Sequence, residues 1–192
     1  MKKKINSGQP AQTLRGKNIV LGITGSIAAY KAPELVRKLK KLGADVTCVL
    51  TENGARFVTP LTLQTLSQNK VYVGMFDPFV WDIEHISLSK KADIIVIAPA
   101  TADIIARISW GRADDLLSSI VLSAKKVPVL LCPAMNENMW NHPATQENIK
   151  RARGYGYRIV QPEEGELACG VRGVGRLADL ENIVQRITDI IG

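Results

Sequence analysis

The chain has 192 residues, a formal net charge of +7 and an aromatic content of 5%. This length suits one domain with a sizeable core. No apolar stretch is long enough to cross a bilayer, so we expect no membrane partner. The three cysteines form no CxxC pair, and the first residues lack the apolar segment of a secretory signal. We therefore expect a cytoplasmic protein whose thiols stay reduced.

Residues 1–16 are predicted to form a basic, flexible tail, and residues 17–192 a single domain. Five of the positive charges lie near the start of the chain, at Lys2, Lys3, Lys4, Arg15 and Lys17. A basic segment can contact nucleic acid, but no aromatic side chains alternate with these residues to stack on bases. We therefore interpret the tail as a solvated arm and expect no nucleic-acid partner.

The domain is predicted to begin with a strand, a glycine turn and a helix. Ile19–Ile23 is an apolar run typical of a buried strand, and apolar residues recur at helical spacing from Ala32 to Leu42. The turn between them contains Gly25 and Ser26. Because the first N–H groups and the dipole of a helix hold anions, Ser26 could donate its hydroxyl to a terminal monophosphate. The glycine spacing is not the full dinucleotide fingerprint, so this segment alone also fits an ordinary strand–helix turn.

Later segments repeat the alternation of strand and helix. Further strands are expected at Asp45–Leu50, Ile94–Ala98, Val127–Cys132 and Tyr157–Val160. Helices are expected after Pro60, between His85 and Asp93, and at Ile104–Ile108, Asp114–Ala124, Ala144–Ala152 and Leu180–Ile191. Together they predict an α/β fold with a doubly wound parallel sheet of Rossmann or flavodoxin type. Residues Gln161–Arg176 are rich in glycine, and we interpret them as a long, mobile, functional loop.

Three side chains could carry chemistry. His85 could transfer protons near neutral pH, Asn136 could donate its amide to a carboxylate, and Cys169 could deliver a proton or attack. Their structural alternatives are an exposed histidine at a helix start, an Asx turn and an inert loop cysteine. Thr51 could contact the phosphate of a mononucleotide, or Glu52 the ribose of a dinucleotide. The other two cysteines fall in apolar strands and are interpreted as packing, and we expect no metal because no zinc-ligand spacing occurs.

Five short motifs follow one another along the chain. They are Gly25-Ser26-Ile27-Ala28-Ala29-Tyr30-Lys31, His85-Ile86-Ser87-Leu88, Ala98-Pro99-Ala100-Thr101-Ala102-Asp103, Pro133-Ala134-Met135-Asn136 and Ala168-Cys169-Gly170. In this order they resemble the homo-oligomeric, flavin-containing cysteine decarboxylases, over essentially all of residues 17–192. The resemblance implies that these residues form an FMN-binding decarboxylase domain.

The resemblance also assigns roles to particular residues. FMN would be held by Gly25, Ser26, Ile27, Ala28, Thr51, Asn53, Thr101, Ala102, Asp103, Ile104 and Ala134. The catalytic residues would be His85 and Cys169, and the substrate-binding residues Asn136, Met135, Ala168 and Gly170. Arg172 or Arg176 could pair with a phosphate on the substrate.

The implied reaction is FMN-dependent decarboxylation of 4'-phospho-N-pantothenoyl-cysteine to 4'-phosphopantetheine in coenzyme A biosynthesis. Two alternatives stay open: oxidative decarboxylation of a peptide's C-terminal cysteine, or a non-catalytic flavin-binding regulatory protein of the same fold. The family implies a homotrimer or a dodecamer of trimers, with FMN near a subunit interface. It also implies a phosphopantothenoylcysteine synthetase domain as a possible partner that these residues do not include.

Overall fold

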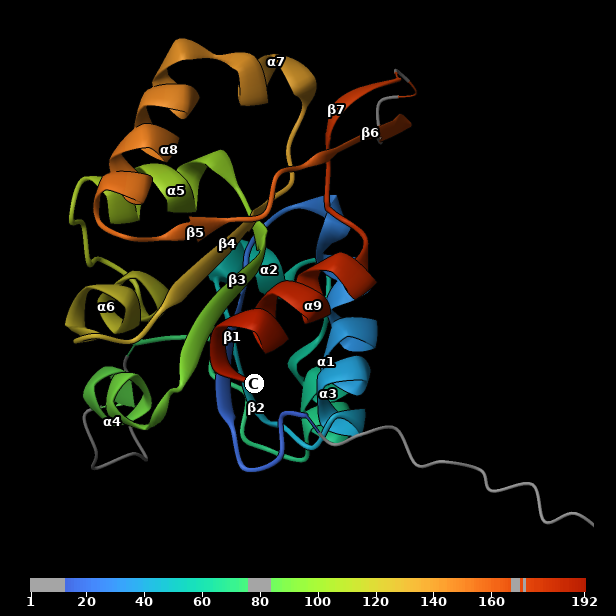
Figure 1. Cartoon of the computed structure of the whole chain (residues 1–192), viewed down its shortest axis with the longest axis vertical. Helices are drawn as coiled ribbons and strands as arrows, with labels where there is room; N and C mark the ends of the chain where they lie inside the picture. Colours follow the sequence, from blue (N-terminus) through green and yellow to red (C-terminus); the bar gives the residue numbers. More distant parts are fainter. Residues whose placement is uncertain (1–12, 76–83, 167–169, 171) are drawn as a thin grey trace, which may run out of the picture.

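A five-stranded parallel sheet forms the centre of the computed structural model, which describes residues 13–75, 84–166, 170 and 172–192 (Figure 1). Its strands are β1 (Asn18–Ile23), β2 (Asp45–Leu50), β3 (Ile94–Ala100), β4 (Val129–Pro133) and β5 (Arg158–Ile159). The strand order β2-β1-β3-β4-β5 is that of flavodoxin-like folds. The predicted α/β fold and its five strands are confirmed, with shifts of one or two residues at some strand ends.

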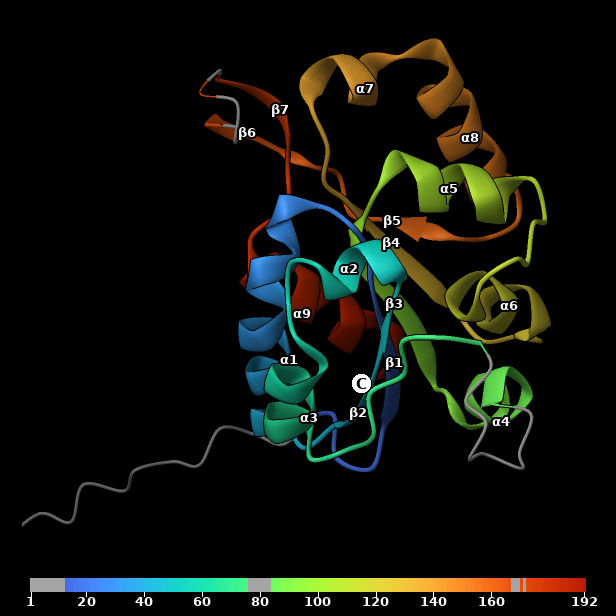
Figure 2. The same ribbon diagram turned by 180° about the vertical axis from the view of Figure 1, so that it is seen from behind.

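Helices cover both faces of the sheet. They are the 3-10 helix η1 (Ile27–Lys31) and α1 (Ala32–Lys41), α2 (Glu52–Ala55), α3 (Pro60–Ser67), α4 (Glu84–Lys91), α5 (Ala102–Ser109), α6 (Leu116–Ser123), α7 (Glu137–Asn141), α8 (Pro143–Gly154) and α9 (Leu180–Ile191). Figures 1 and 2 show α1, α3 and α9 on one face, and α4, α5, α6 and α8 on the other. The two buried clusters divide in the same way, so the sheet is doubly wound as predicted.

The side-chain alternation of β1 explains why both faces need a helix layer. Ile19 and Leu21 pack in the α1–α9 layer, and Val20 packs in the α5–α6 layer. A Cβ on Gly22 would lie 2.6 Å from Leu117 Cδ1, so the absence of a side chain there lets α6 approach the strand closely. Every residue of β3 is buried, as expected for a central parallel strand.

The glycine-rich segment Gln161–Arg176 is not the long loop that its composition suggests. It contains an antiparallel hairpin of β6 (Glu163–Glu166) and β7 (Arg172–Arg176), so the loop prediction is wrong for these strands. Gly175 has a φ of +154°, and a Cβ there would collide with the carbonyl oxygen of Met135. The glycine therefore permits close packing rather than mobility.

The beginning of the chain is anchored before the expected domain boundary at residue 17. Leu14 is fully buried, and its N–H donates to the Leu42 carbonyl at 3.0 Å. Residues 1–12 lie outside the described part, so the flexible tail stays a prediction there. None of the described helices is long and apolar enough to span a membrane. Within the same residues, no group of three or more acidic, histidine or cysteine side chains could hold a metal.

Candidate active site

Four helix N-termini meet at the carboxyl edge of the sheet. Each is capped by a polar residue that follows a strand: Ser26 Oγ accepts from Ala28 N (3.4 Å), Thr51 Oγ1 from Gly54 N (3.1 Å), Thr101 Oγ1 from Ile104 N (3.4 Å) and Asn136 Oδ1 from Asn138 N (2.9 Å). Serine, threonine and asparagine cap helices because a short side chain can reach the first N–H groups. Several helix starts thus face the edge where open α/β folds bind ligands.

A buried threonine joins the ends of β1 and β3. The Thr24 hydroxyl donates to the Pro99 carbonyl at 2.8 Å and accepts from the Thr101 N–H at 3.1 Å. The Ala98–Pro99 peptide bond at this point is cis. Since the strand order reverses between β1 and β3, this contact lies at the point where flavodoxin-like folds bind their ligand.

The β1–η1 turn also packs directly against α2. A Cβ on Gly25 would lie 2.5 Å from Asn53 Cβ and 3.3 Å from the Asn53 carbonyl carbon. Gly54 approaches β1 equally closely, because a Cβ there would collide with the Ile23 carbonyl oxygen. The structure therefore brings together Gly25, Asn53 and the Thr51 cap, three residues that the resemblance assigns to the cofactor.

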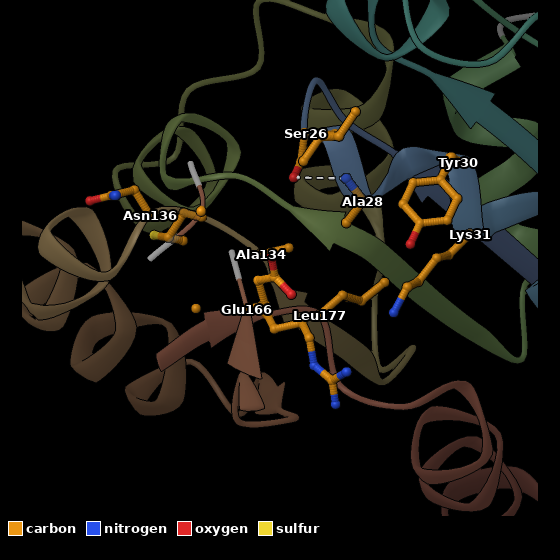
Figure 3. Close-up of a pocket in the computed structure, with 13 residues that line it drawn as sticks. Ser26, Ala28, Tyr30, Lys31, Ala134, Asn136, Glu166 and Leu177 are labelled. Atoms are coloured by element: carbon orange, nitrogen blue, oxygen red, sulfur yellow. Dashed lines mark hydrogen bonds between the residues drawn. The ribbon is translucent and has the colours of Figure 1, made fainter. Parts of the chain in front are cut away.

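A cavity of about 690 Å³ opens beside these turns (Figure 3). It is lined by Ser26, Ile27, Ala28, Tyr30, Lys31, Ala134, Met135, Asn136, Glu166, Gly170, Gly175, Arg176 and Leu177. In Figure 3, Asn136 and Lys31 lie at opposite ends of the view, with Ser26 and Ala134 between them. The volume falls within the range of about 300–1,000 Å³ that small-molecule and cofactor sites occupy.

Seven of the predicted site residues line this cavity: Ser26, Ile27, Ala28, Ala134, Met135, Asn136 and Gly170. Thr51 and Thr101 lie at the neighbouring turns, and Asn53 lies in α2. The Asp103 carboxylate accepts from Arg107 Nε at 2.9 Å, and the Ile104 side chain is buried in the core. Sequence reasoning gave no role to Tyr30 and Lys31, although both belong to the first motif, nor to Glu166, Gly175 and Leu177.

Of the two arginines suggested for a substrate phosphate, only Arg176 lines the cavity. Its Nη2 donates to Glu163 at 2.7 Å, and its buried Nε has no hydrogen-bond partner among the described residues. Arg172 instead forms an exposed ion pair with Glu164 at 3.2 Å. Burial has the largest single effect on the pKa of Glu163 and raises it. The hydrogen bonds from Asp179 N–H and Arg176, with the nearby positive charges, outweigh burial and hold the pKa below its ordinary value.

His85 belongs to α4, and this helix does not lie beside the cavity of its own chain. The segment after α4 is fixed at the amino edge of the sheet, where Asp93 N–H donates to the Asn18 carbonyl at 2.9 Å. Figures 1 and 2 show α4 at the end of the molecule opposite to α7 and the hairpin. The other predicted catalytic residue, Cys169, and its neighbour Ala168 lie outside the described residues.

The two cysteines interpreted as packing are fully buried, which confirms that interpretation. Burial raises the pKa of the Cys48 thiol to about 12 and also raises that of Cys132. Neither thiol lines the cavity. Both therefore stay protonated at neutral pH and take no part in the site.

A doubly wound sheet with capped helix starts and a cavity at its carboxyl edge is the arrangement in which flavodoxin-like α/β proteins bind their ligands. Residues 7–192 match the family described as Flavoprotein, and the chain belongs to this family.

Two curated relatives place the chain more closely. A Streptococcus mutans protein named "Probable phosphopantothenoylcysteine decarboxylase" is 44% identical over 177 residues, which cover 90% of this chain and 98% of the relative. The coenzyme A biosynthesis bifunctional protein CoaBC of Haemophilus influenzae is 48% identical over 92% of this chain. The chain spans only 44% of that relative's length.

Solved structures agree with this placement. A mutant PPC decarboxylase complexed with pantothenoylaminoethenethiol superposes with a TM-score of 0.81 at 28% identity, over 90% of this chain and 97% of that chain. The FMN-dependent cysteine decarboxylase SpaF superposes with a TM-score of 0.80 at 30% identity, over 92% of this chain and 95% of that chain.

Proposed function

We propose that this chain decarboxylates 4'-phospho-N-pantothenoyl-cysteine to 4'-phosphopantetheine with FMN, as a cytoplasmic step of coenzyme A biosynthesis. One observation carries the proposal: Asn136 lines a cofactor-sized cavity at the carboxyl edge of the sheet, where the strand order reverses between β1 and β3. The chain also belongs to the Flavoprotein family. Similarity to a named decarboxylase over nearly its whole length supports the same substrate.

The residues at the carboxyl edge fit FMN. Gly25 lets the β1–η1 turn pack closely against Asn53, so that the helix starts at Ser26 and Thr51 lie next to each other. These N–H groups would hold the phosphate, while Thr101–Ile104 and Ala134 would lie along the flavin ring. FMN held by these residues would supply the electron acceptor that a cysteine carboxylate lacks, by reversible oxidation of the substrate's thiol-bearing carbon.

Asn136 would orient the substrate's carboxylate for departure. Its Oδ1 accepts from Asn138 N–H at 2.9 Å, which fixes the plane of the amide. The N–H donors of an asparagine amide are on Nδ2, and a carboxylate accepts hydrogen bonds, so Nδ2 is the atom that would bind the substrate's carboxylate. The helix cap and the substrate contact are therefore two uses of one side chain.

His85 would serve the cavity of a neighbouring subunit, because α4 lies at the far edge of its own sheet. This assignment predicts a homo-oligomer, a trimer or a dodecamer of trimers, whose sites are completed between chains. His85→Asn and Asn136→Ala variants should each be inactive alone. Mixed oligomers should recover about one quarter of the wild-type activity, since about one quarter of sites then receive both intact residues. No recovery in verified mixed oligomers would place both residues in one chain's site or remove one from the mechanism.

The direct test is mass spectrometry of purified protein incubated with phosphopantothenoyl-cysteine. Appearance of 4'-phosphopantetheine would establish the reaction and the substrate together. Bound flavin with unchanged substrate would contradict the proposed reaction. In the bifunctional relatives the chain matches one part only, so we also propose a phosphopantothenoylcysteine synthetase as the partner activity that supplies the substrate.

A second candidate is oxidative decarboxylation of a peptide's C-terminal cysteine. The 30% identity to the FMN-dependent cysteine decarboxylase SpaF supports this second candidate. Its product would be the enethiol, two hydrogens lighter than the reduced product, and mass spectrometry with a cysteine-ended peptide separates the two reactions. Cys169→Ser tests the same distinction, because loss of the proposed proton donor should make a decarboxylated, oxidised product accumulate from phosphopantothenoyl-cysteine.

A further inference from the structure

The hairpin strand β7 is attached to α7 by a carboxylate that does not line the cavity. Glu137 Oε1 accepts a hydrogen bond from the Val174 N–H at 3.1 Å. A Cβ on the buried residue Gly173 would lie 2.6 Å from the carboxyl carbon of Glu137. The carboxylate therefore rests directly on the backbone of β7, in a space that only glycine leaves open.

This contact joins the two walls of the cavity. One wall is the β4–α7 segment with Met135 and Asn136, and the other is the end of β7 with Gly175 and Arg176. The walls meet at a backbone hydrogen bond from Met135 N–H to the Gly175 carbonyl, at 3.0 Å. Glu137 adds the next contact along β7, immediately beside Asn136 in the sequence.

The hairpin needs such an anchor. Within the described part of the chain, the sheet that contains β6 and β7 has two strands, and a two-stranded hairpin is at most marginally stable in water by itself. A hydrogen bond to a carboxylate is stronger than one between neutral groups. Glu137 therefore adds a hydrogen bond from outside the hairpin to the backbone of β7.

We propose that Glu137 is a positioning residue, which sets the β7 wall of the cavity against Asn136 and thereby the width of the substrate site. The inference rests on the proposed function in one respect, that Asn136 binds the substrate's carboxylate. Its physical part, the attachment of β7 by Glu137, holds whatever the substrate is.

The first test is hydrogen exchange of the Val174 amide in the protein with bound flavin and without substrate. Glu137→Ala should raise the exchange rate of this amide at least about tenfold, while amides of β3 stay unchanged. Glu137→Gln should keep most of the protection, because the amide oxygen of glutamine can also accept from Val174 N–H. The control Glu164→Ala removes an exposed carboxylate from the same hairpin and should leave Val174 protected. Unchanged exchange in Glu137→Ala would overturn the proposal.

The second test separates positioning from general stability. In Glu137→Ala, KM for phosphopantothenoyl-cysteine should rise about tenfold while kcat falls less than about threefold, and Glu137→Gln should restore most of the loss. A proportional loss of kcat with unchanged KM would overturn the role in substrate positioning. If the wild type does not turn over this substrate, the proposed function fails, and the exchange experiment still decides the role of Glu137.

A double-mutant cycle tests the contact itself. Gly173→Ala should displace the Glu137 carboxylate and increase Val174 exchange, as Glu137→Ala does. Adding Gly173→Ala to Glu137→Ala should have little further effect, because the atoms that the new Cβ meets are already gone. Additive effects of the two substitutions would show that they act through separate contacts and would overturn the proposal.

Discussion

Replacing Gly25 by alanine should separate the two turns that form the phosphate end of the proposed FMN site. The new Cβ would lie 2.5 Å from Asn53 Cβ, whereas carbon atoms in contact are about 3.5–4.0 Å apart. The β1–η1 turn and α2 must therefore move apart by about 1 Å. Overpacking of this kind costs about 1–3 kcal/mol of folding stability.

Flavin binding should suffer more than stability. The helix start that follows Gly25 carries Ser26 and the Ala28 N–H. A displacement of about 1 Å lengthens hydrogen bonds of about 2.9 Å beyond useful range. Losing one or two such bonds to a phosphate should weaken FMN binding by at least about tenfold, because hydrogen bonds to charged groups contribute about 1.5–3 kcal/mol each.

The assay is the flavin absorbance per polypeptide after purification, followed by titration of the apoprotein with FMN and by urea unfolding. Gly154→Ala is the matched control, since nothing lies within 4 Å of its new Cβ and the residue ends helix α8. It should leave flavin binding unchanged and stability equal or slightly higher.

A second substitution identifies the contact. In the Gly25→Ala background, Asn53→Gly should restore flavin binding in part, because it removes the Cβ that is struck but also the side chain that the resemblance assigns to FMN. Asn53→Ala keeps that Cβ and should not restore binding. Wild-type flavin content in Gly25→Ala, or equal rescue by both Asn53 substitutions, would refute the reasoning.

Other contacts give further predictions. Thr24→Val should lower the free energy of unfolding by about 2–3 kcal/mol in urea, because the buried Pro99 carbonyl and the partly buried Thr101 N–H lose their partner; a cost below about 0.5 kcal/mol would contradict this. Glu163→Gln should lower the free energy of unfolding at pH 7, and by progressively less as the pH falls below the ordinary carboxyl pKa of 4.5. A carboxyl group whose pKa is lowered by folding stabilises the folded protein only while it is ionised. A loss of stability that does not depend on pH would refute this. Cys48 and Cys132 should be alkylated by iodoacetamide only in denaturant, because burial raises both thiol pKa values; rapid labelling of the native protein would be the contrary result.

The sheet could be predicted from the sequence because its strands are short apolar runs buried on both faces. The runs at Ile19–Ile23 and Ile94–Ala98 are followed within a few residues by Ser26 and Thr101, which cap the next helices. Strand, cap and helix are all local signals, so the carboxyl-edge turns of the site were predictable too.

The hairpin could not be predicted because its stability comes from distant residues. The strands Glu163–Glu166 and Arg172–Arg176 have no apolar alternation, and their glycines suggested a mobile loop. Gly173 and Gly175 are instead small because Glu137 and Met135 pack against the backbone. Nothing in a local window shows which neighbour requires a glycine.

The position of His85 was predictable in principle. A residue shortly before a parallel strand lies at the amino edge of the sheet, whereas ligand-binding turns follow the strands. His85 lies in the short helix α4, and the segment after this helix enters β3 at the amino edge, so His85 lies away from Asn136 in the same chain. The resemblance assigned the chemistry of both residues, and the distance of α4 from the cavity is the reason for our proposal that they meet between chains.

The walls of the cavity come from segments far apart in the sequence, from Ser26 after β1 to Leu177 after β7. During synthesis, the first turn is made early, but the opposite wall emerges only after residue 177 has left the ribosome. A nascent chain that stops before β7 therefore lacks part of the pocket wall. Cofactor loading should thus follow the synthesis of β7, and the stabilisation that comes from ligand binding is gained only by chains that include it.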